Sequence, residues 1–118
     1  PFLLYDGSGL SRFNGTSARH WVEILRYMQT ESAASDVFFK SLPISGQSGT
    51  MKYFGRQTAL KGKFYAKSGA IDRVRAYAGY WAAPGQDTLC MALLVNNYQG
   101  KSHEIRQKME NLLASLVQ

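Results

Sequence analysis

The sequence is poor in the features that mark disulfide-stabilised, membrane-spanning and metal-binding proteins. Its single cysteine, Cys90, stands in an apolar run, so no internal disulfide can form and a small buried side chain is the expected role. No apolar stretch approaches the roughly 20 residues that a membrane helix needs. The longest, Leu89–Val95, has the length of a buried strand. The two histidines, His20 and His103, stand apart from any acidic cluster, so we expect no metal site and no cofactor.

Positive charge exceeds negative charge, with 14 Lys and Arg against 8 Asp and Glu and a net charge of +6. This excess favours anionic partners through long-range attraction. The basic residues of the central third are spread rather than gathered into a stripe, and no nucleic-acid-binding motif is present. We therefore expect a solvated basic surface and no nucleic-acid partner. The length of 118 residues allows one domain or a part of one.

Hydrophobic periodicity predicts helices at both ends of the chain. Thr16 or Ser17 can cap a first helix whose apolar residues share one face. These residues are Trp21, Ile24, Leu25 and Met28. A shorter helix over 35–42 is expected to end before Pro43, because the residue before a proline disfavours helical backbone. A third helix, over 102–117, carries a single apolar stripe.

Three strand-like segments occupy 62–70, 73–82 and 88–98, separated by short turns. Connections this short force neighbouring strands to run antiparallel. The predicted fold class is α+β, with two N-terminal helices, a three-stranded antiparallel sheet and a C-terminal helix on the sheet. The apolar run of the third strand needs cover on both faces, and the sequence offers one good covering helix. We therefore expect part of the sheet to be uncovered.

The most informative segment is Lys67-Ser68-Gly69, at the far end of the first predicted strand. A cation, a hydroxyl donor and a bare backbone in adjacent positions suit the capture of a small ligand that bears a carboxylate. Period-two alternation places Lys67 and Ser68 on opposite faces of the strand. Both can serve one ligand only if it lies along the strand edge, where it would bind like an added strand.

A second motif is Asp6-Gly7-Ser8-Gly9-Leu10-Ser11-Arg12, in which glycines flank Ser8 and expose its hydroxyl. Taken alone, the motif is typical of a turn that precedes a helix cap. It is not a nucleophile elbow, because the Gly-x-Ser-x-Gly pattern is absent.

Three motifs, in this order, carry a resemblance to a known family. They are the segment 6–12, the string Leu42-Pro43-Ile44-Ser45-Gly46 with Gly49-Thr50, and Ala66-Lys67-Ser68-Gly69. Together they resemble the C-terminal part of the D-alanyl-D-alanine carboxypeptidase/endopeptidase family of low-molecular-mass class C penicillin-binding proteins. The resemblance extends from about Leu4 to the final helix. It implies that residues 1–118 form a single partial domain of the penicillin-binding fold, which is similar to that of serine β-lactamases.

The family's nucleophile belongs to a Ser-x-x-Lys motif, and no serine here has a lysine three positions on. The resemblance therefore places the nucleophile outside this sequence. It maps the family's Ser-x-Asn motif onto Ser8-Gly9-Leu10, with Leu10 in place of the asparagine. Ser8 would relay a proton between the lysine base and the leaving nitrogen.

The family's Lys-Thr/Ser-Gly motif maps onto Lys67-Ser68-Gly69. By this resemblance, Lys67 supplies positive potential to the substrate's terminal carboxylate and to Ser8. Ser68 hydrogen-bonds the same carboxylate, and Gly69 lets the substrate approach the main chain. The backbone N–H of Ala70 would be one half of the oxyanion hole.

The resemblance implies a serine-type D-Ala-D-Ala carboxypeptidase or endopeptidase of the periplasm or cell envelope. It would act on peptidoglycan peptides that end in D-Ala-D-Ala, through an acyl-serine, and β-lactams would inhibit it. This chain alone should be inactive. The alternative is a non-catalytic module that binds peptides or glycans at the Lys67–Gly69 strand edge. A serine β-lactamase fragment is a third option, which the segment 6–12 disfavours.

The resemblance also predicts self-association of the isolated chain. In the family's strand order, the segment 88–98 neighbours a strand that this sequence lacks, so its edge would be free. Exposed apolar edges tend to pair with another chain. We expect association through this strand edge or through an uncovered sheet face.

Overall fold

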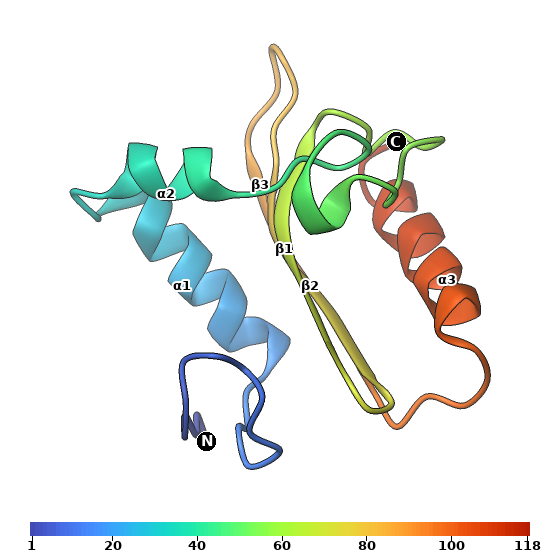
Figure 1. The fold of residues 1–118 in the computed structure, drawn as a ribbon. Coiled ribbons are helices and arrows are strands. Elements are labelled where there is room, and N and C mark those ends of the chain that lie inside the picture. The colour runs from blue at the N-terminus through green and yellow to red at the C-terminus, as the bar shows by residue number, and fades with distance from the viewer.

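The computed structural model describes residues 1–118, which form three α-helices and one three-stranded antiparallel sheet (Figure 1). The helices are α1 (Ala18–Thr30), α2 (Ser35–Ser41) and α3 (Ser102–Ser115), with a short 3₁₀ helix, η1 (Gly49–Met51), before the sheet. The strands are β1 (Phe64–Ile71), β2 (Val74–Trp81) and β3 (Leu89–Asn96). The α+β class and the order of the elements expected from the sequence are confirmed.

The sheet is a meander in the order β1-β2-β3. Ile71 pairs with Val74, so β1 extends one residue further than the sequence predicted and the turn consists of Asp72 and Arg73. Arg73 takes a φ of +55°, and its guanidinium donates hydrogen bonds to the carbonyls of Tyr98 (3.2 Å) and Asn97 (3.4 Å). These bonds tie the tip of the β1–β2 hairpin to the end of β3.

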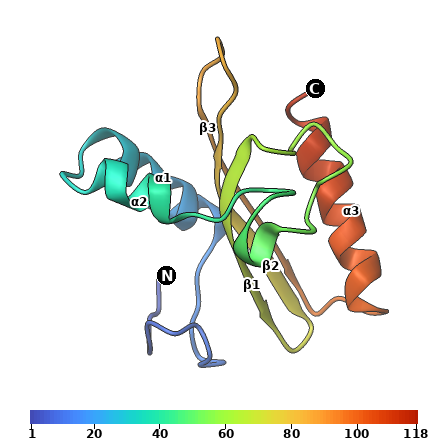
Figure 2. The same ribbon diagram turned by 45° about the horizontal axis from the view of Figure 1, so that its top comes forward.

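Helices cover both faces of the sheet, with α3 on one side and α1 and α2 on the other (Figures 1 and 2). Tyr80 is buried, and its hydroxyl donates a 2.5 Å hydrogen bond to the carbonyl of Leu25 on α1. The Phe39 ring of α2 packs on the rings of Tyr65 and Tyr80, with centroid distances of 4.5 and 5.7 Å. The expectation of a single covering helix was therefore wrong, because alternate strand residues present large rings to α1 and α2.

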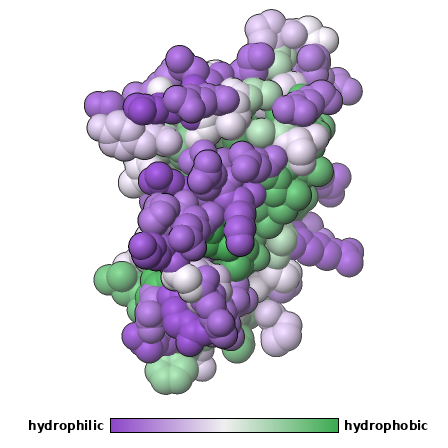
Figure 3. Space-filling view, turned by 90° about the vertical axis from the view of Figure 1, so that its right-hand side faces the viewer, coloured by the Kyte–Doolittle hydropathy of each residue, from purple (hydrophilic) through white to green (hydrophobic).

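The main core lies on the α3 face, where residues of the sheet, the segment before β1 and α3 pack together. Its members are Met51, Phe54, Leu60, Phe64, Ala66, Tyr77, Trp81, Met91, Met109, Leu113 and Ala114. The rings of Phe54 and Tyr77 stack with centroids 4.1 Å apart. Outside this core, the α3 side of the molecule presents a largely hydrophilic surface (Figure 3).

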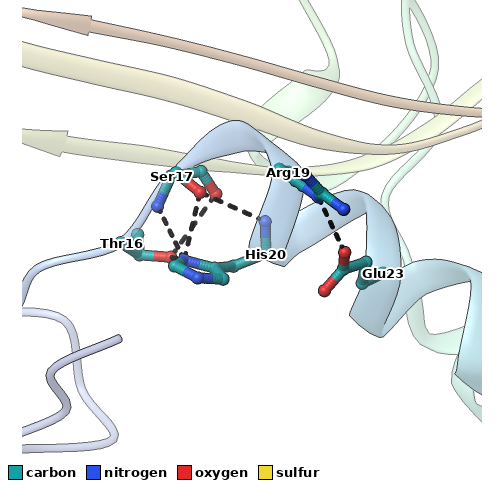
Figure 4. Close-up of polar contacts among 5 residues, drawn as sticks. All are labelled: Thr16, Ser17, Arg19, His20 and Glu23. Carbon is teal, nitrogen blue, oxygen red and sulfur yellow. Dashed lines mark hydrogen bonds and ion pairs between the residues drawn. The ribbon is translucent and has the colours of Figure 1, made fainter. Parts of the chain in front are cut away.

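Helix α1 begins with a reciprocal cap between Ser17 and His20 (Figure 4). The Ser17 hydroxyl accepts a hydrogen bond from the backbone N–H of His20 (3.3 Å), and His20 Nδ1 accepts one from the backbone N–H of Ser17 (3.1 Å). Of the two caps considered from the sequence, the structure uses Ser17. Such caps stabilise a helix by about 1 kcal/mol.

Apolar side chains are exposed along the first residues and on one side of α1. They include Phe2, Leu3, Leu4, Tyr5, Leu10, Phe13, Ile24 and Tyr27. Strand β3 stands at the edge of the sheet, where Leu89 is also exposed. Self-association through this edge stays a prediction. None of the helices has the length and hydropathy that a membrane crossing requires.

Burial raises the pKa of Tyr80 to about 12, with a smaller contribution from the nearby thiol of Cys90. The folded state therefore holds the Tyr80 proton more tightly than the unfolded state, where the pKa is about 10. Stability from this group is complete below pH 10 and is lost as the pH rises toward 12. We expect the unfolding free energy to fall over this range by about 2 kcal/mol more in the wild type than in Tyr80→Phe.

Chemical denaturation at a series of pH values measures this difference. Tyr27→Phe is the matched control, because Tyr27 is 54% exposed and should leave the wild-type decline unchanged. At neutral pH, Tyr80→Phe should cost about 1 kcal/mol through the lost hydrogen bond to Leu25. Identical alkaline slopes in all three proteins would contradict the expectation.

Candidate active site

The outer edge of β1 is paired along only half of its length. The backbone N–H of Ser45 donates to the carbonyl of Phe64, and the N–H of Ala66 donates to the carbonyl of Pro43, both at 2.9 Å. Ile44 forms an isolated bridge with Tyr65 between these bonds. The pairing stops at Ala66. The second half of β1, residues 67–71, has β2 on its inner side and no strand on its outer side.

Backbone direction along β1 follows from these hydrogen bonds. Phe64 and Ala66 turn their N–H and C=O groups away from β2, toward the segment 43–45. Because the direction alternates with every residue, Ser68 and Ala70 must also turn theirs toward the outer edge. The open half of the edge therefore offers the backbone groups of Ser68 and the N–H of Ala70 to an added strand.

The side chains of Lys67 and Ser68 lie on opposite faces of β1. Lys67 is exposed. It lies on the same face of β1 as Tyr65, which packs on α2. Its ammonium donates a 2.8 Å hydrogen bond to the carbonyl of Ser68, so the charge lies close to the open edge. Ser68 is half-buried on the α3 face, opposite Tyr77 of β2. Only a ligand that lies along the edge itself can meet both side chains.

Two glycines, Gly79 and Gly69, lie near this edge, and the packing of the strands requires only the first of them. An added Cβ at Gly79 of β2 would lie 2.5 Å from the Cα of Ala66 and closer still to the Tyr65 carbonyl, so β1 and β2 can approach only because this side chain is missing. An added Cβ at Gly69 would meet only the Ala76 Cβ, at an ordinary 3.8 Å. Gly69 has no positive φ either. The fold therefore tolerates a side chain at position 69.

The loop that contains Ser8 is organised by the Asp6 carboxylate. Four groups donate hydrogen bonds to it at 2.9–3.1 Å. They are the backbone N–H groups of Gly9 and Ser11, the Ser8 hydroxyl and the Asn14 side-chain amide. Asn14 in turn accepts a hydrogen bond from the backbone N–H of Tyr5 at 2.8 Å. These bonds, that from Asn14 first, hold the pKa of Asp6 below its ordinary value of 3.8.

The structure does not bring Ser8 into hydrogen-bond contact with Lys67. The Ser8 hydroxyl is engaged by Asp6, and the Lys67 ammonium by the Ser68 carbonyl. Leu10, which stands at the asparagine position of the mapped motif, is 73% exposed and offers no polar group there. The loop meets the β1–β2 hairpin through Arg12 and Asp72, whose charged groups are 3.9 Å apart and largely exposed. An exposed pair of this kind contributes at most about 1 kcal/mol.

Two features of this site were missed at the level of sequence. One is the central position of Asp6 in its loop. An aspartate that precedes Ser8 by two residues and Gly9 by three is a common turn signal, and this signal could have indicated it. The other is the pairing of the segment 43–45 with β1, which divides the strand edge into a closed and an open half. Pro43 supplies only a carbonyl to this pairing, which is the one backbone group that proline retains.

The Asp6 loop predicts a measurable titration. Because hydrogen bonds to the ionised carboxylate lower the pKa of Asp6, the loop gains stability above the unfolded pKa and loses it as the pH falls through the folded one. Asn14→Ala removes the largest contribution, so we expect the pKa of Asp6 to rise toward 3.8. Carboxyl ¹³C shifts recorded by NMR against pH measure it. Ser41→Ala, a serine change on α2 far along the chain, should leave the pKa of Asp6 unaltered.

Comparisons with known proteins identify the family and the fold of this chain. Residues 1–116 match the D-Ala-D-Ala carboxypeptidase 3 (S13) family. A D-alanyl-D-alanine carboxypeptidase from Actinomadura sp. (strain R39) is 36% identical over 104 residues, which are 83% of this chain and 19% of that protein. Penicillin binding protein 4 (dacB) from Haemophilus influenzae superposes with a TM-score of 0.83 at 25% identity, over 98% of this chain and 27% of that one. The same protein complexed with a β-lactam superposes with a TM-score of 0.81 at 25% identity, over 94% and 28%.

The chain thus spans about a fifth of the curated relative and little more than a quarter of the solved structures. Within that span, the similarity includes nearly every residue from the Asp6 loop to α3. The fold of the similar structures and the family found by sequence agree with each other. This chain belongs to the D-Ala-D-Ala carboxypeptidase 3 (S13) family.

Proposed function

We propose that the full-length protein containing this chain is a serine-type D-Ala-D-Ala carboxypeptidase or endopeptidase of the cell envelope or periplasm. It acts on peptidoglycan stem peptides through an acyl-serine intermediate. One observation carries the proposal beyond family membership: the outer edge of β1 is open only where Lys67, Ser68, Gly69 and Ala70 stand together. The sequence contains no Ser-x-x-Lys, so the nucleophile belongs to another part of the protein and this chain alone is inactive.

The open edge fits the binding of a peptide's C-terminal end. The peptide lies along β1 and hydrogen-bonds the outward backbone groups of Ser68 and Ala70. The Lys67 ammonium attracts its terminal carboxylate, and the Ser68 hydroxyl donates a hydrogen bond to the same group. The Ala70 N–H then faces the scissile carbonyl as one oxyanion donor. Its partner donor comes from outside the chain, and loss of one such donor typically costs 10²–10³ in rate.

β-Lactams fit the same arrangement, because they carry a carboxylate near a reactive amide carbonyl. We propose that they bind along this edge in place of the peptide and acylate the external nucleophile. Gly69 supports this proposal, since nothing within the chain requires a glycine at that position. The absence of a side chain there leaves room for a ligand to approach the main chain.

A non-catalytic module that binds peptides or glycans at the same edge is the second candidate. It is favoured by one observation, namely that the chain has a binding edge and no nucleophile of its own. The two candidates differ in covalent chemistry. Only the peptidase forms a stable acyl adduct with a penicillin in the full-length protein.

Lys67→Ala in the full-length protein should lower the rate of covalent labelling by a fluorescent penicillin by about 10- to 100-fold. The reason is the loss of a charged donor to the ligand's carboxylate. Gly69→Ala should lower it by at least about tenfold, while the unfolding free energy changes by only about 0.5 kcal/mol. Labelling is followed by gel fluorescence over time and stability by thermal denaturation.

Lys63→Ala is the matched control, because Lys63 is exposed and precedes Lys67 by four positions on the same side of the chain. It should label at the wild-type rate. Wild-type labelling in both Lys67→Ala and Gly69→Ala would remove the open edge from the proposal. A full-length protein that binds D-Ala-D-Ala peptides without ever being labelled would favour the binding module.

The proposed relay role of Ser8 is tested separately. A relay requires the Ser8 hydroxyl to leave Asp6, to which it donates at 3.1 Å. We therefore expect Ser8→Ala to slow labelling of the full-length protein less than Lys67→Ala does. A slowing equal to that of Lys67→Ala would assign Ser8 to the reaction itself, whereas an unchanged rate would limit it to holding the loop. Ser11→Ala is the control, because the Asp6 carboxylate binds the backbone of Ser11 and not its side chain.

A further inference from the structure

A polar pocket of about 250 Å³ lies between α3 and the segment that precedes β1. One face of the first turns of α3, from His103 through Arg106 to Glu110, forms one wall. Arg56 and Gln57 belong to the facing segment. These two parts of the chain are far apart in sequence, and the packing of Phe54 and Met109 into one core brings them together. We call this the basic pocket.

The charges in the basic pocket do not balance. Its two guanidinium groups, of Arg56 and Arg106, face a single carboxylate, of Glu110. Arg106 Nε is 3.7 Å from Glu110 Oε1, which is too long for a hydrogen bond. The same Nε is buried and has no hydrogen-bond partner. Glu110 is the only carboxylate that lines the basic pocket, and it leaves the Nε–H of Arg106 without a hydrogen bond.

Arg56 is held at the pocket without a carboxylate partner. Its guanidinium carbon lies 5.6 Å from the centre of the Tyr53 ring, a cation–π arrangement that orients the group and leaves its N–H donors free. No carboxylate oxygen lies within 4 Å of the guanidinium nitrogens of Arg56. His103, in the first turn of the 14-residue helix α3, adds an imidazole where the helix dipole contributes positive potential.

We propose that the basic pocket binds an oxyanion of the phosphate type. Two guanidinium groups on opposite walls can each present a fork of N–H donors to such a group. The Gln57 amide and the His103 ring add further N–H donors. The α3 side of the molecule presents mainly hydrophilic residues beside an apolar band (Figure 3). The phosphate is either a free ion or a phosphodiester of an anionic polymer.

The basic pocket contains no residue of β1, and the sheet separates it from Lys67. The pocket is on the α3 side, whereas Lys67 shares the other face with Tyr65 and α2. Phosphate binding in the basic pocket therefore does not depend on the proposed peptidase function, and either can fail without the other.

The experiment is a calorimetric titration of the full-length protein with inorganic phosphate and, in parallel, with an oligomer of glycerol phosphate. Sodium chloride keeps the ionic strength constant, because exposed charges are screened by salt. We expect saturable binding to the wild type. Arg56→Gln and Arg106→Gln should each weaken it by about tenfold through loss of a charged donor. Glu110→Gln should strengthen it, because the only competing carboxylate is removed.

Lys108→Gln is the matched control, since Lys108 lies on α3, is exposed and does not line the pocket. It should bind phosphate like the wild type. Absence of saturable binding of either probe, or equal weakening in Lys108→Gln and Arg56→Gln, would overturn the proposal. Tighter binding of the oligomer than of the free ion would identify a polymer as the source, and equal binding would identify the ion. Arg56 is exposed, so Arg56→Gln keeps the test decisive even if Arg106→Gln unfolds.

Discussion

The hydrogen-bonding capacity of the outer edge of β1 is the constraint on which the rest of the site depends. Each strand carries backbone donors and acceptors on both sides. In β1, pairing with β2 satisfies the groups on one side only. The segment 43–45 satisfies the first half of the other side and ends at Ala66. What remains open is a short stretch that begins at Lys67. The location of the proposed peptide site is thus set by where an internal strand partner stops.

The remaining structure holds this edge in place from several directions. The missing side chain of Gly79 allows β1 and β2 to approach closely opposite Ala66. Tyr80 and Phe39 anchor the covering helices on the face that carries Lys67. The Asp6 network shapes the loop that reaches the β1–β2 turn through Arg12. A rigid edge costs a bound peptide less entropy, because the receptor need not be ordered at the moment of binding.

Much of the fold was predictable because it rests on local patterns. The apolar spacing around Leu25 predicted α1, Pro43 marked the end of α2, and short turns imposed the antiparallel meander. Observed boundaries agree with these expectations to within two residues. The cover of the second sheet face was not predicted, since it depends on rings such as Phe39 meeting Tyr65 across the fold. The Asp6 network was missed for a related reason: its hydrogen bonds to Asn14 span eight residues of irregular chain.

The sequence by itself determined the element order, the family motifs and the absence of a Ser-x-x-Lys nucleophile, because each is a property of spacing along the chain. It also placed Lys67 and Ser68 on opposite faces of a strand, since side chains alternate there. Only the tertiary structure decided which part of that strand stays open, and that Ser8 bonds Asp6 rather than Lys67. It alone brought Arg56 and Arg106 to one pocket. Pairing and packing between distant segments have no local signature, so they become visible only in the folded chain.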